Sequence, residues 1–409
     1  MTGLSARILA GLVLGLLAGA ALAGSQASGP LLAVAQPVGK LWLDALTMTV
    51  VPLVFSLLVT GIVSAADSAS GGRTAPRALL WFAVLLVGAC LVSALLTTLA
   101  LDLWPVPARA ASLRSLGGER PAMSSTADWL ANIIPTNPIK AASETAMVPL
   151  VIFALLFGFA VSRIEPELRA SVQTFFRAVV QAMLVIVQWV LWIAPLGVFA
   201  LAFAVGARTG VSAAGTLLQY VVLVVNGCLV TALLSYAVVA LLGRMSPLAF
   251  ARAALPAQVV AASTQSSLAS LPAMIEAASP LGISKAEAGI VLPLAVSIFR
   301  AASAAANVTV AIYLGHLHGV ALGPATLLLG ALVAAAVSVG AVGLPAQVSF
   351  FAIIGPVCLA MGVPIDLLPL LLAVETIPDI FRTLGNVTAD LAVARLVGRG
   401  SDPAKAAVS

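Results

Sequence analysis

Apolar segments of about twenty residues or more follow one another along nearly the whole chain of 409 residues. A helix of about 20 apolar residues crosses the hydrocarbon core of a bilayer. It also satisfies its own backbone hydrogen bonds, which lipid cannot do. Charged residues make up 9% of the chain, against about a quarter in soluble domains, so a water-soluble surface is excluded. The sequence therefore predicts an all-α membrane protein with the lipid bilayer as its surroundings.

The simple spans lie in the first 250 residues or so, where apolar length and charged flanks define them. We expect spans at about 5–24, 41–65, 78–103, 136–162, 172–203 and 211–243. The segment 104–135 contains proline, glycine and charged residues and is typical of an exposed loop. In the first span Gly11, Gly15 and Gly19 recur every four residues, which favours a generic helix-packing face over a specific dimer motif.

Lysine and arginine near the ends of the spans indicate the orientation, because they accumulate on the cytoplasmic side. The group that includes Arg7, Arg77, Arg163 and Arg244 is the larger one. We therefore expect a multi-pass inner-membrane protein with both termini in the cytoplasm. The basic residues occur singly and form no patch with interleaved aromatics, so the net charge of +5 does not indicate a nucleic-acid partner.

Beyond residue 250 a broken segment precedes a full helix twice. The segments 253–281 and 321–362 are interrupted by small and polar residues, and spans at about 286–314 and 367–396 follow them. Close helix packing would explain one such cluster. Two clusters, each before a charged helix, favour re-entrant hairpins, and paired interrupted segments indicate the binding site of a transporter built from inverted repeats.

The last span contains charged and amide side chains that could bind a solute. Its polar residues are spaced by 4, 3, 4 and 4 positions, which places them on one stripe of a helix: Glu375, Asp379, Arg382, Asn386 and Asp390. Charges within a membrane are costly, so they usually face a partner, a cavity or a substrate. A structural ladder of ion pairs is the alternative, and Asp390 has the further alternative of lying solvated near an interface.

Arg382 and Asp379 together suit a zwitterion. The planar guanidinium of Arg382 matches a carboxylate, and Asp379 one turn away can accept from an ammonium group. Helix N-termini at the hairpin tips would also favour an anion. This pattern indicates a small anionic solute, with aspartate or glutamate preferred over a simple dicarboxylate, which Asp379 would repel.

Several motifs resemble the glutamate transporter homologue family, the dicarboxylate/amino acid:cation symporters. Residues Asp379–Asp390 are similar to its last-helix signature, D-x-G-R-T-x-x-N-x-x-x-D. Ser266–Pro272 resembles the serine motif of its first hairpin, and Gly343–Pro345 the tip of the second. Pro135–Pro138 and Ala194–Phe199 resemble parts of its fourth and fifth spans. The resemblance covers nearly the whole chain, and the last-helix signature is specific.

The resemblance implies eight transmembrane helices plus two re-entrant helical hairpins in an elevator-type transporter that forms a homotrimer. We expect residues 1–76 to form N-terminal helices shared by the scaffold and the transport part, and residues 77–110 to form a third span in the transport part. Residues 111–243 would form scaffold helices with an external loop. Residues 244–398 would form the transport core, and residues 399–409 a cytoplasmic tail.

The resemblance also implies a substrate site. Its residues would be Ser266, Ser267, Gly343, Asp379, Arg382, Thr383 and Asn386. Asp379 would take the amino group of the substrate and Arg382 its side-chain carboxylate. Asp390 would be a cation ligand, for sodium, and coupling would further involve Asn386, Glu375 and Arg300.

One motif departs from the family. Where the family's seventh span has Asn-Met-Asp-Gly-Thr, this chain has Phe299-Arg300-Ala301-Ala302-Ser303, so both sodium-binding side chains are missing. We expect the guanidinium of Arg300 to take over space and charge that sodium would supply, and to pair with Asp390. Smaller departures are Gln265, Ala346, Val348, Pro378 and Phe381.

The charge of the site limits its coupling. Arg300 and Arg382 face Glu375, Asp379 and Asp390, which leaves one net negative charge for one proton or one cation. Glu375 is the candidate proton carrier, because burial favours the protonated form of a carboxyl group. No cofactor is expected besides Na⁺ or H⁺ as the coupling ion.

The interpretation is a secondary carrier of an acidic amino acid with altered or lost sodium coupling. The alternatives are a proton-coupled carrier of a C4-dicarboxylate or another amino acid, and a sodium-independent exchanger. No catalytic motif indicates an enzyme. A channel or a substrate sensor remains the other class of function.

Overall fold

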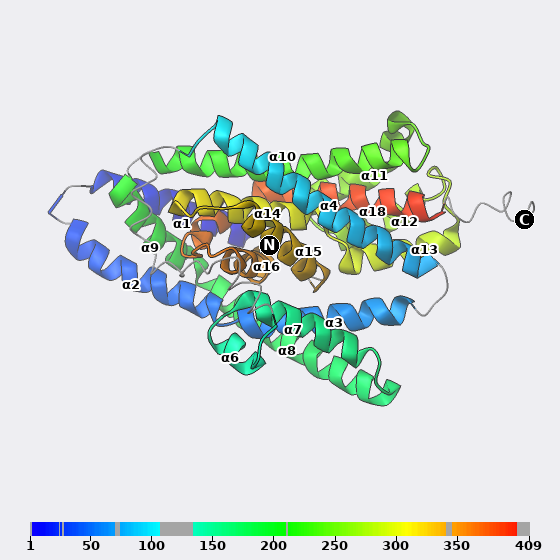
Figure 1. The fold of residues 1–409 in the computed structure, drawn as a ribbon. Coiled ribbons are helices and arrows are strands. Elements are labelled where there is room, and N and C mark those ends of the chain that lie inside the picture. The colour runs from blue at the N-terminus through cyan, green and yellow to red at the C-terminus, as the bar shows by residue number, and fades with distance from the viewer. Residues whose placement is uncertain are drawn as a thin grey trace, which may run out of the picture.

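In a computed structural model of the protein, the residues described are 2–23, 25–26, 28–69, 74–106, 134–209, 212–340 and 346–398, and their only regular elements are helices. Figure 1 shows most of the helices running along one common direction. In the N-terminal half the helices are α1 (Thr2–Ala21), α2 (Ser28–Thr47), α3 (Val50–Ala69), α4 (Thr74–Leu103), α6 (Pro138–Ser143), α7 (Met147–Val161), α8 (Pro166–Trp192) and α9 (Ala194–Thr209). In the C-terminal half they are α10 (Ser212–Leu241), α11 (Pro247–Thr264), α12 (Ser267–Ala277), α13 (Lys285–Ile298), α14 (Ala301–His318), α15 (Pro324–Gly340), α16 (Ala346–Ala360), α17 (Leu368–Leu372) and α18 (Thr376–Gly398).

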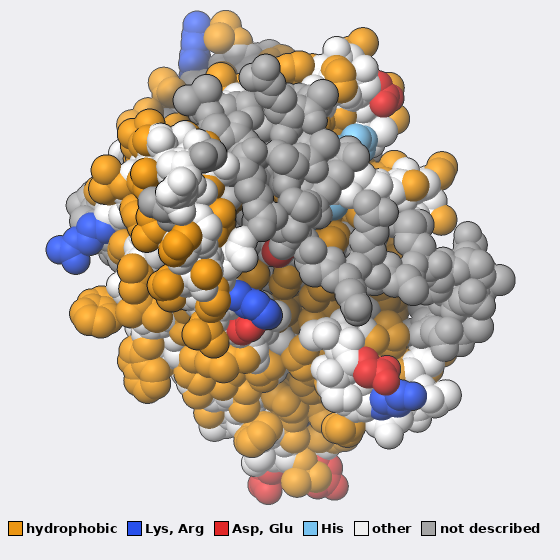
Figure 2. All heavy atoms as spheres, turned by 90° about the vertical axis from the view of Figure 1, so that its left-hand side faces the viewer, with side chains coloured by type: hydrophobic (Ala, Val, Ile, Leu, Met, Phe, Trp, Pro, Cys, Tyr) orange, Lys and Arg blue, Asp and Glu red, His pale blue; other side chains and the backbone are white. Residues whose placement is uncertain are grey.

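The outer surface of the bundle is apolar. Large hydrophobic side chains are exposed on many helices, including Leu14, Leu80, Leu95, Trp189 and Leu233. Among the coloured residues on the face drawn in Figure 2, hydrophobic side chains predominate and charged ones are few. Among the described residues, five helical stretches are long and apolar enough to cross a membrane. A surface of this kind suits lipid and not water, so the prediction of an all-helical membrane protein is confirmed, while the count of eight spans stays a prediction.

Several predicted spans are broken, which apolar length alone did not predict. The span expected at 136–162 contains α6 and α7, and Thr145 between them has a left-handed φ of 53°. The span expected at 172–203 covers most of α8 and the first part of α9, which are separated at Ile193. Pro195 follows, and it has no N–H to donate to α8, but it fits the first turn of α9.

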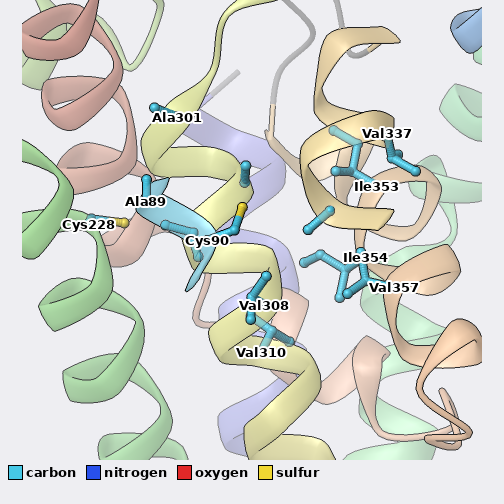
Figure 3. Packing of buried hydrophobic residues seen from close by; sticks show 14 of the residues in the cluster. Ala89, Cys90, Cys228, Ala301, Val308, Val310, Val337, Ile353, Ile354 and Val357 are labelled. Carbon is cyan, nitrogen blue, oxygen red and sulfur yellow. The ribbon is translucent and has the colours of Figure 1, made fainter. Parts of the chain in front are cut away.

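Helix α14 forms the centre of the molecule. All of its residues except His316 are buried, which is expected of a helix that is apolar on every side and packed on every side. It packs against α4, α10, α15, α16 and α18. Figure 3 shows its residues Val308 and Val310 between Cys228 of α10 and the α15–α16 pair, where Ile354 and Val357 lie.

The helices gather in two groups. One group contains α1 and α2 packed on α9, and α3 packed on α7 and α8. The other contains α4, α10, α11 and α13 packed on the central α14 and α18, either directly or through one another. The predicted division of the chain placed residues 111–243 with the scaffold, whereas α10 packs extensively on α14 and α18. That division stays a prediction, and the packing favours moving α10 to the transport part.

The two interrupted segments form pairs of packed helices. Helices α11 and α12 pack against each other, and the chain turns between them at Gln265, which has a left-handed φ of 53°. Helix α11 is tied to α18 by a hydrogen bond of 2.9 Å from Gln258 Nε2 to Thr388 Oγ1. Helices α15 and α16 also pack against each other. The first pair therefore lies directly against the helix that carries the predicted site.

Candidate functional site

A buried ion pair occupies the start of α18. Arg382 Nη2 lies 2.5 Å from Glu375 Oε1, and both side chains are buried. The N–H groups of Arg382 are not aimed along this line, so the contact is an ion pair and not a well-formed hydrogen bond. The Tyr220 hydroxyl on α10 donates to Glu375 Oε2 at 2.6 Å. Glu375 is therefore held from two sides, by a guanidinium and by a phenol.

Asp379 lies one turn from Arg382 and is also buried. Its carboxylate interacts with the positive charges of Arg382 and Arg300. Thr383 donates its hydroxyl to the backbone carbonyl of Asp379 at 2.9 Å, so the Thr383 oxygen can still accept a hydrogen bond. The stripe predicted from the sequence is thus buried as a set, and one of its possible ion pairs is formed.

The side-chain amide of Asn386 forms hydrogen bonds to the start of α14. Its Oδ1 accepts from the backbone N–H groups of Ala302 and Ser303 at 3.0 and 3.1 Å. Its Nδ2 donates to Ser303 Oγ at 2.9 Å. Helix α14 begins in the middle of the molecule with Arg300 at its N-cap, and the Arg300 side chain makes no cap hydrogen bond. The amide of Asn386 supplies that cap from the neighbouring helix.

The positive charge of Arg300 and the negative charge of Asp390 attract each other. Asp390 is fully buried, and neither of its carboxylate oxygens has a hydrogen-bond partner among the described residues. Among the described residues, Asp390 therefore makes no direct ion pair with Arg300, although the sequence predicted one. What the structure shows is a longer-range attraction, with the two carboxylate oxygens left available.

The residues near Asp390 differ from the sodium-binding motif that the resemblance implies. Phe299 stacks on Phe82 of α4, with ring centroids 4.6 Å apart and an angle of 14° between the planes, and both rings are buried. Ala301 offers no side-chain oxygen. Sodium needs several hard oxygen ligands, whereas Asn386 Oδ1 is already used and Arg300 supplies a positive charge. A packed aromatic pair and a fixed cation stand where ligand oxygens would be required.

The serines of the first helix pair lie at its turn. Ser266 is the N-cap of α12, and its hydroxyl oxygen accepts from the Ala269 backbone N–H at 3.2 Å. The hydroxyl of Ser267 has no hydrogen-bond partner in the part of the chain that the structure describes. Gly343, at the centre of the second interrupted segment, lies outside the described residues. The N-terminus of α12 thus provides backbone donors and one unused hydroxyl, which suits an anionic group.

Two groups that complete the site were not identified from the sequence. Tyr220 and Cys228 both belong to α10, and both interact with the charges of Glu375 and Arg382. They lie two helical turns apart, at positions i and i+8 on one face. No local signal marks them, because neither belongs to a charged or periodic motif in this largely apolar helix. Only the packing of α10 on α18 brings them to the ion pair.

Together, the apolar outer surface, the helices interrupted within the bundle and the charged cluster at its centre define a multi-pass membrane transporter. Residues 4–399 match the sodium:dicarboxylate symporter family, and the chain belongs to this family. The resemblance found from the motifs is therefore confirmed.

Relatives of known activity agree on the class but differ in substrate. The chain is 28% identical to a proton/glutamate-aspartate symporter of Escherichia coli (strain K12), over 95% of this chain and 92% of that protein. It is 32% identical to the neutral amino acid transporter B(0) of Oryctolagus cuniculus, over 97% of this chain and 80% of that protein. It is 27% identical to a C4-dicarboxylate transport protein of Solibacter usitatus (strain Ellin6076), over 89% of this chain and 86% of that protein.

Proposed function

We propose that the protein is a secondary active transporter of an acidic amino acid, aspartate or glutamate, or of a related small anionic solute, with altered or lost sodium coupling. The observation that carries this proposal is the buried guanidinium of Arg382 beside the carboxylate of Asp379 on α18. A guanidinium binds a carboxylate with two parallel hydrogen bonds. Asp379 provides the complementary acceptor for an ammonium group, so the pair suits a zwitterion that carries an extra carboxylate.

In the structure, Glu375 holds the guanidinium that the substrate would need. An incoming carboxylate would replace Glu375 Oε1 at Arg382 Nη2, and Glu375 would then keep the Tyr220 hydroxyl as its partner. At Arg382 the carboxylate of the substrate therefore replaces the carboxylate of Glu375. The buried guanidinium has a partner before and after binding, which limits the free-energy cost of burying its charge. Glu375 can take up a proton when Arg382 leaves it, and this is the proposed point of proton coupling.

Arg300 determines which coupling ion the site can accept in this proposal. Its fixed positive charge acts on Asp379 and Asp390 from within the bundle. With two arginines against three carboxylates, the site keeps one net negative charge, enough for one proton or one cation. The packed rings of Phe299 and Phe82 support loss of the family's sodium site at this position. Coupling to one proton, coupling to fewer sodium ions, and sodium-independent exchange are the modes of transport that this charge allows.

Further parts of the proposal follow the family. The chain would form a homotrimer in the inner membrane with both termini in the cytoplasm. It would have eight spans, with α11–α12 and α15–α16 as re-entrant hairpins, and it would move its transport part as an elevator. Packing of α11 and α12 against α18 supports the position of the first hairpin beside the site.

Counterflow in proteoliposomes tests the proposal. Vesicles loaded with unlabelled aspartate should accumulate labelled aspartate without sodium, and glutamate should compete more strongly than alanine or succinate. Arg382→Met should abolish the exchange, because the substrate carboxylate loses its charged partner. Counterflow of labelled succinate in succinate-loaded vesicles, with none of labelled aspartate, would instead favour the C4-dicarboxylate alternative that the Solibacter usitatus relative suggests. An ohmic leak without counterflow would contradict a carrier altogether.

A further inference from the structure

A cavity of about 670 Å³ lies between α3, α8 and α13. This volume is in the range of small-ligand sites, about 300–1,000 Å³. None of the charged residues of the α18 site lines it. Each helix contributes residues at the spacing of one helical face, for example Arg177, Val180, Gln181 and Leu184 of α8. It is therefore a separate cavity, bounded by both groups of helices.

One end of this cavity is polar and the other is apolar. Arg177 and Gln181 precede Leu184 on α8, and on α3 Ser64 follows Leu57 by two turns. Gln173 Nε2 donates to Ser64 Oγ at 3.3 Å, so Ser64 is level with the start of α8.

The same alignment appears one turn further out, where Arg169 pairs with Asp67 at 3.3 Å. The polar ends of α3 and α8 therefore meet at one mouth. The inner wall is mostly apolar. Helix α13 adds Leu294 and Ile298 to it, and the hydroxyl of Ser297 between them donates to the Pro293 carbonyl at 2.8 Å.

Arg177 is the cation at this mouth. It lies eleven residues into α8, about 16 Å along the axis from Pro166. Among the residues that the structure describes, no acid pairs with it, whereas the neighbouring Arg169 has Asp67. A cation at the edge of an apolar cavity attracts an anion, and a guanidinium matches a phosphate group in shape and charge.

We propose that this cavity binds an anionic phospholipid, with its phosphate at Arg177 and one acyl chain along the apolar wall of α3, α8 and α13. The polarity gradient is that of an amphiphile with one charged end. The bilayer around the protein is the source of such a molecule at high local concentration. Because the bound lipid touches both groups of helices, its occupancy would affect any movement of one group against the other.

Native mass spectrometry with added phosphatidylglycerol tests the proposal. The native protein should retain phosphatidylglycerol in preference to phosphatidylcholine. Arg177→Gln should weaken this binding about tenfold, the effect of losing one charge-assisted contact. Arg77→Gln, the same change at an exposed arginine of α4 outside the cavity, should leave it unchanged. Equal binding of the two lipids, or equal loss in the two variants, would overturn the proposal.

Photolabelling locates the acyl chain. Phosphatidylglycerol with a diazirine in its chain should label peptides of α8 and α13 that line the cavity, and Leu184→Trp, which fills the apolar end, should remove this labelling. Labelling confined to other helices would place the lipid elsewhere and reject the site. If palmitate displaced the probe while unlabelled phosphatidylglycerol did not, the occupant would be a free fatty acid, contrary to the proposal.

Discussion

At the residue scale, the buried charges around Arg382 are arranged so that each has more than one possible partner. Arg382 faces Glu375 directly and Asp379 electrostatically, and Glu375 faces Arg382 and Tyr220. Removing one member of a buried pair leaves an uncompensated charge and is strongly destabilising. A site with spare partners avoids this when a substrate takes one of them. Tyr220 has this role for Glu375.

Tyr220→Phe should make substrate binding depend more steeply on pH than it does in the native protein. When a substrate takes Arg382, the ionised Glu375 of the variant has no donor left, so it must take up a proton. Binding then includes proton uptake, and the affinity for aspartate should fall as pH rises. Isothermal titration at pH 6 and pH 8 measures this effect. The control is Tyr313→Phe, which loses a hydrogen bond of the same length, 2.6 Å, to the Thr216 carbonyl. It should lower stability without making the pH dependence steeper, and identical behaviour of the two variants would rule out the role given to Tyr220.

At the element scale, helix α14 depends on a cap from another helix. It begins at Ala301 in the interior, where its first N–H groups have no water. Asn386 accepts from two of them. The break at Phe299 and Arg300 is therefore stabilised by α18, and the charged stripe of α18 has a structural function in addition to any binding function.

Asn386→Ala should destabilise the start of α14. Two backbone N–H groups and the Ser303 hydroxyl lose their partner, at about 1–3 kcal/mol for each buried group left unsatisfied. Amide hydrogen exchange at Ala302 and Ser303 should accelerate, and the apparent unfolding temperature should fall. Asn307→Ala removes another buried amide of α14, whose Nδ2 has no partner among the described residues, and should cost less. Unchanged exchange at Ala302 in Asn386→Ala would disprove the cap.

The glycine stripe of α1 is a second feature at this scale. A Cβ on Gly15 would lie 2.5 Å from the Phe199 carbonyl oxygen and 2.8 Å from the Ala202 Cβ, so α1 packs on α9 backbone to backbone. Gly15→Ala should therefore destabilise the protein by about 1–3 kcal/mol, the usual cost of overpacking. Gly88→Ala in α4 has open space for the added methyl group and should be neutral or slightly stabilising. Chemical unfolding in detergent compares the two, and equal effects would refute the close packing.

At the scale of the whole molecule, coupling is the property to be tested. Arg300→Met removes the fixed positive charge near Asp379 and Asp390. Native counterflow should proceed without sodium, whereas the variant should need an external cation or fail to exchange. Arg252→Met, at an exposed arginine of α11, is the control and should behave like the native protein. Strict sodium dependence of native transport, unchanged in Arg300→Met, would show that Arg300 does not replace a cation.

The sequence by itself determined the class and the charged stripe. Apolar length fixes the membrane environment, and the spacing of residues 375–390 fixes one helical face, because both are local properties of the chain. Local motifs also sufficed to identify the family.

Only the tertiary structure decided the partners of that stripe. Tyr220 reaches Glu375 across 155 positions of the chain, Asn386 caps a helix that begins 85 residues earlier, and Phe82 fills the space beside Phe299. Such contacts depend on which helices pack together. A chain that is apolar almost everywhere carries little local information about packing, since its helices offer lipid and protein the same kind of surface.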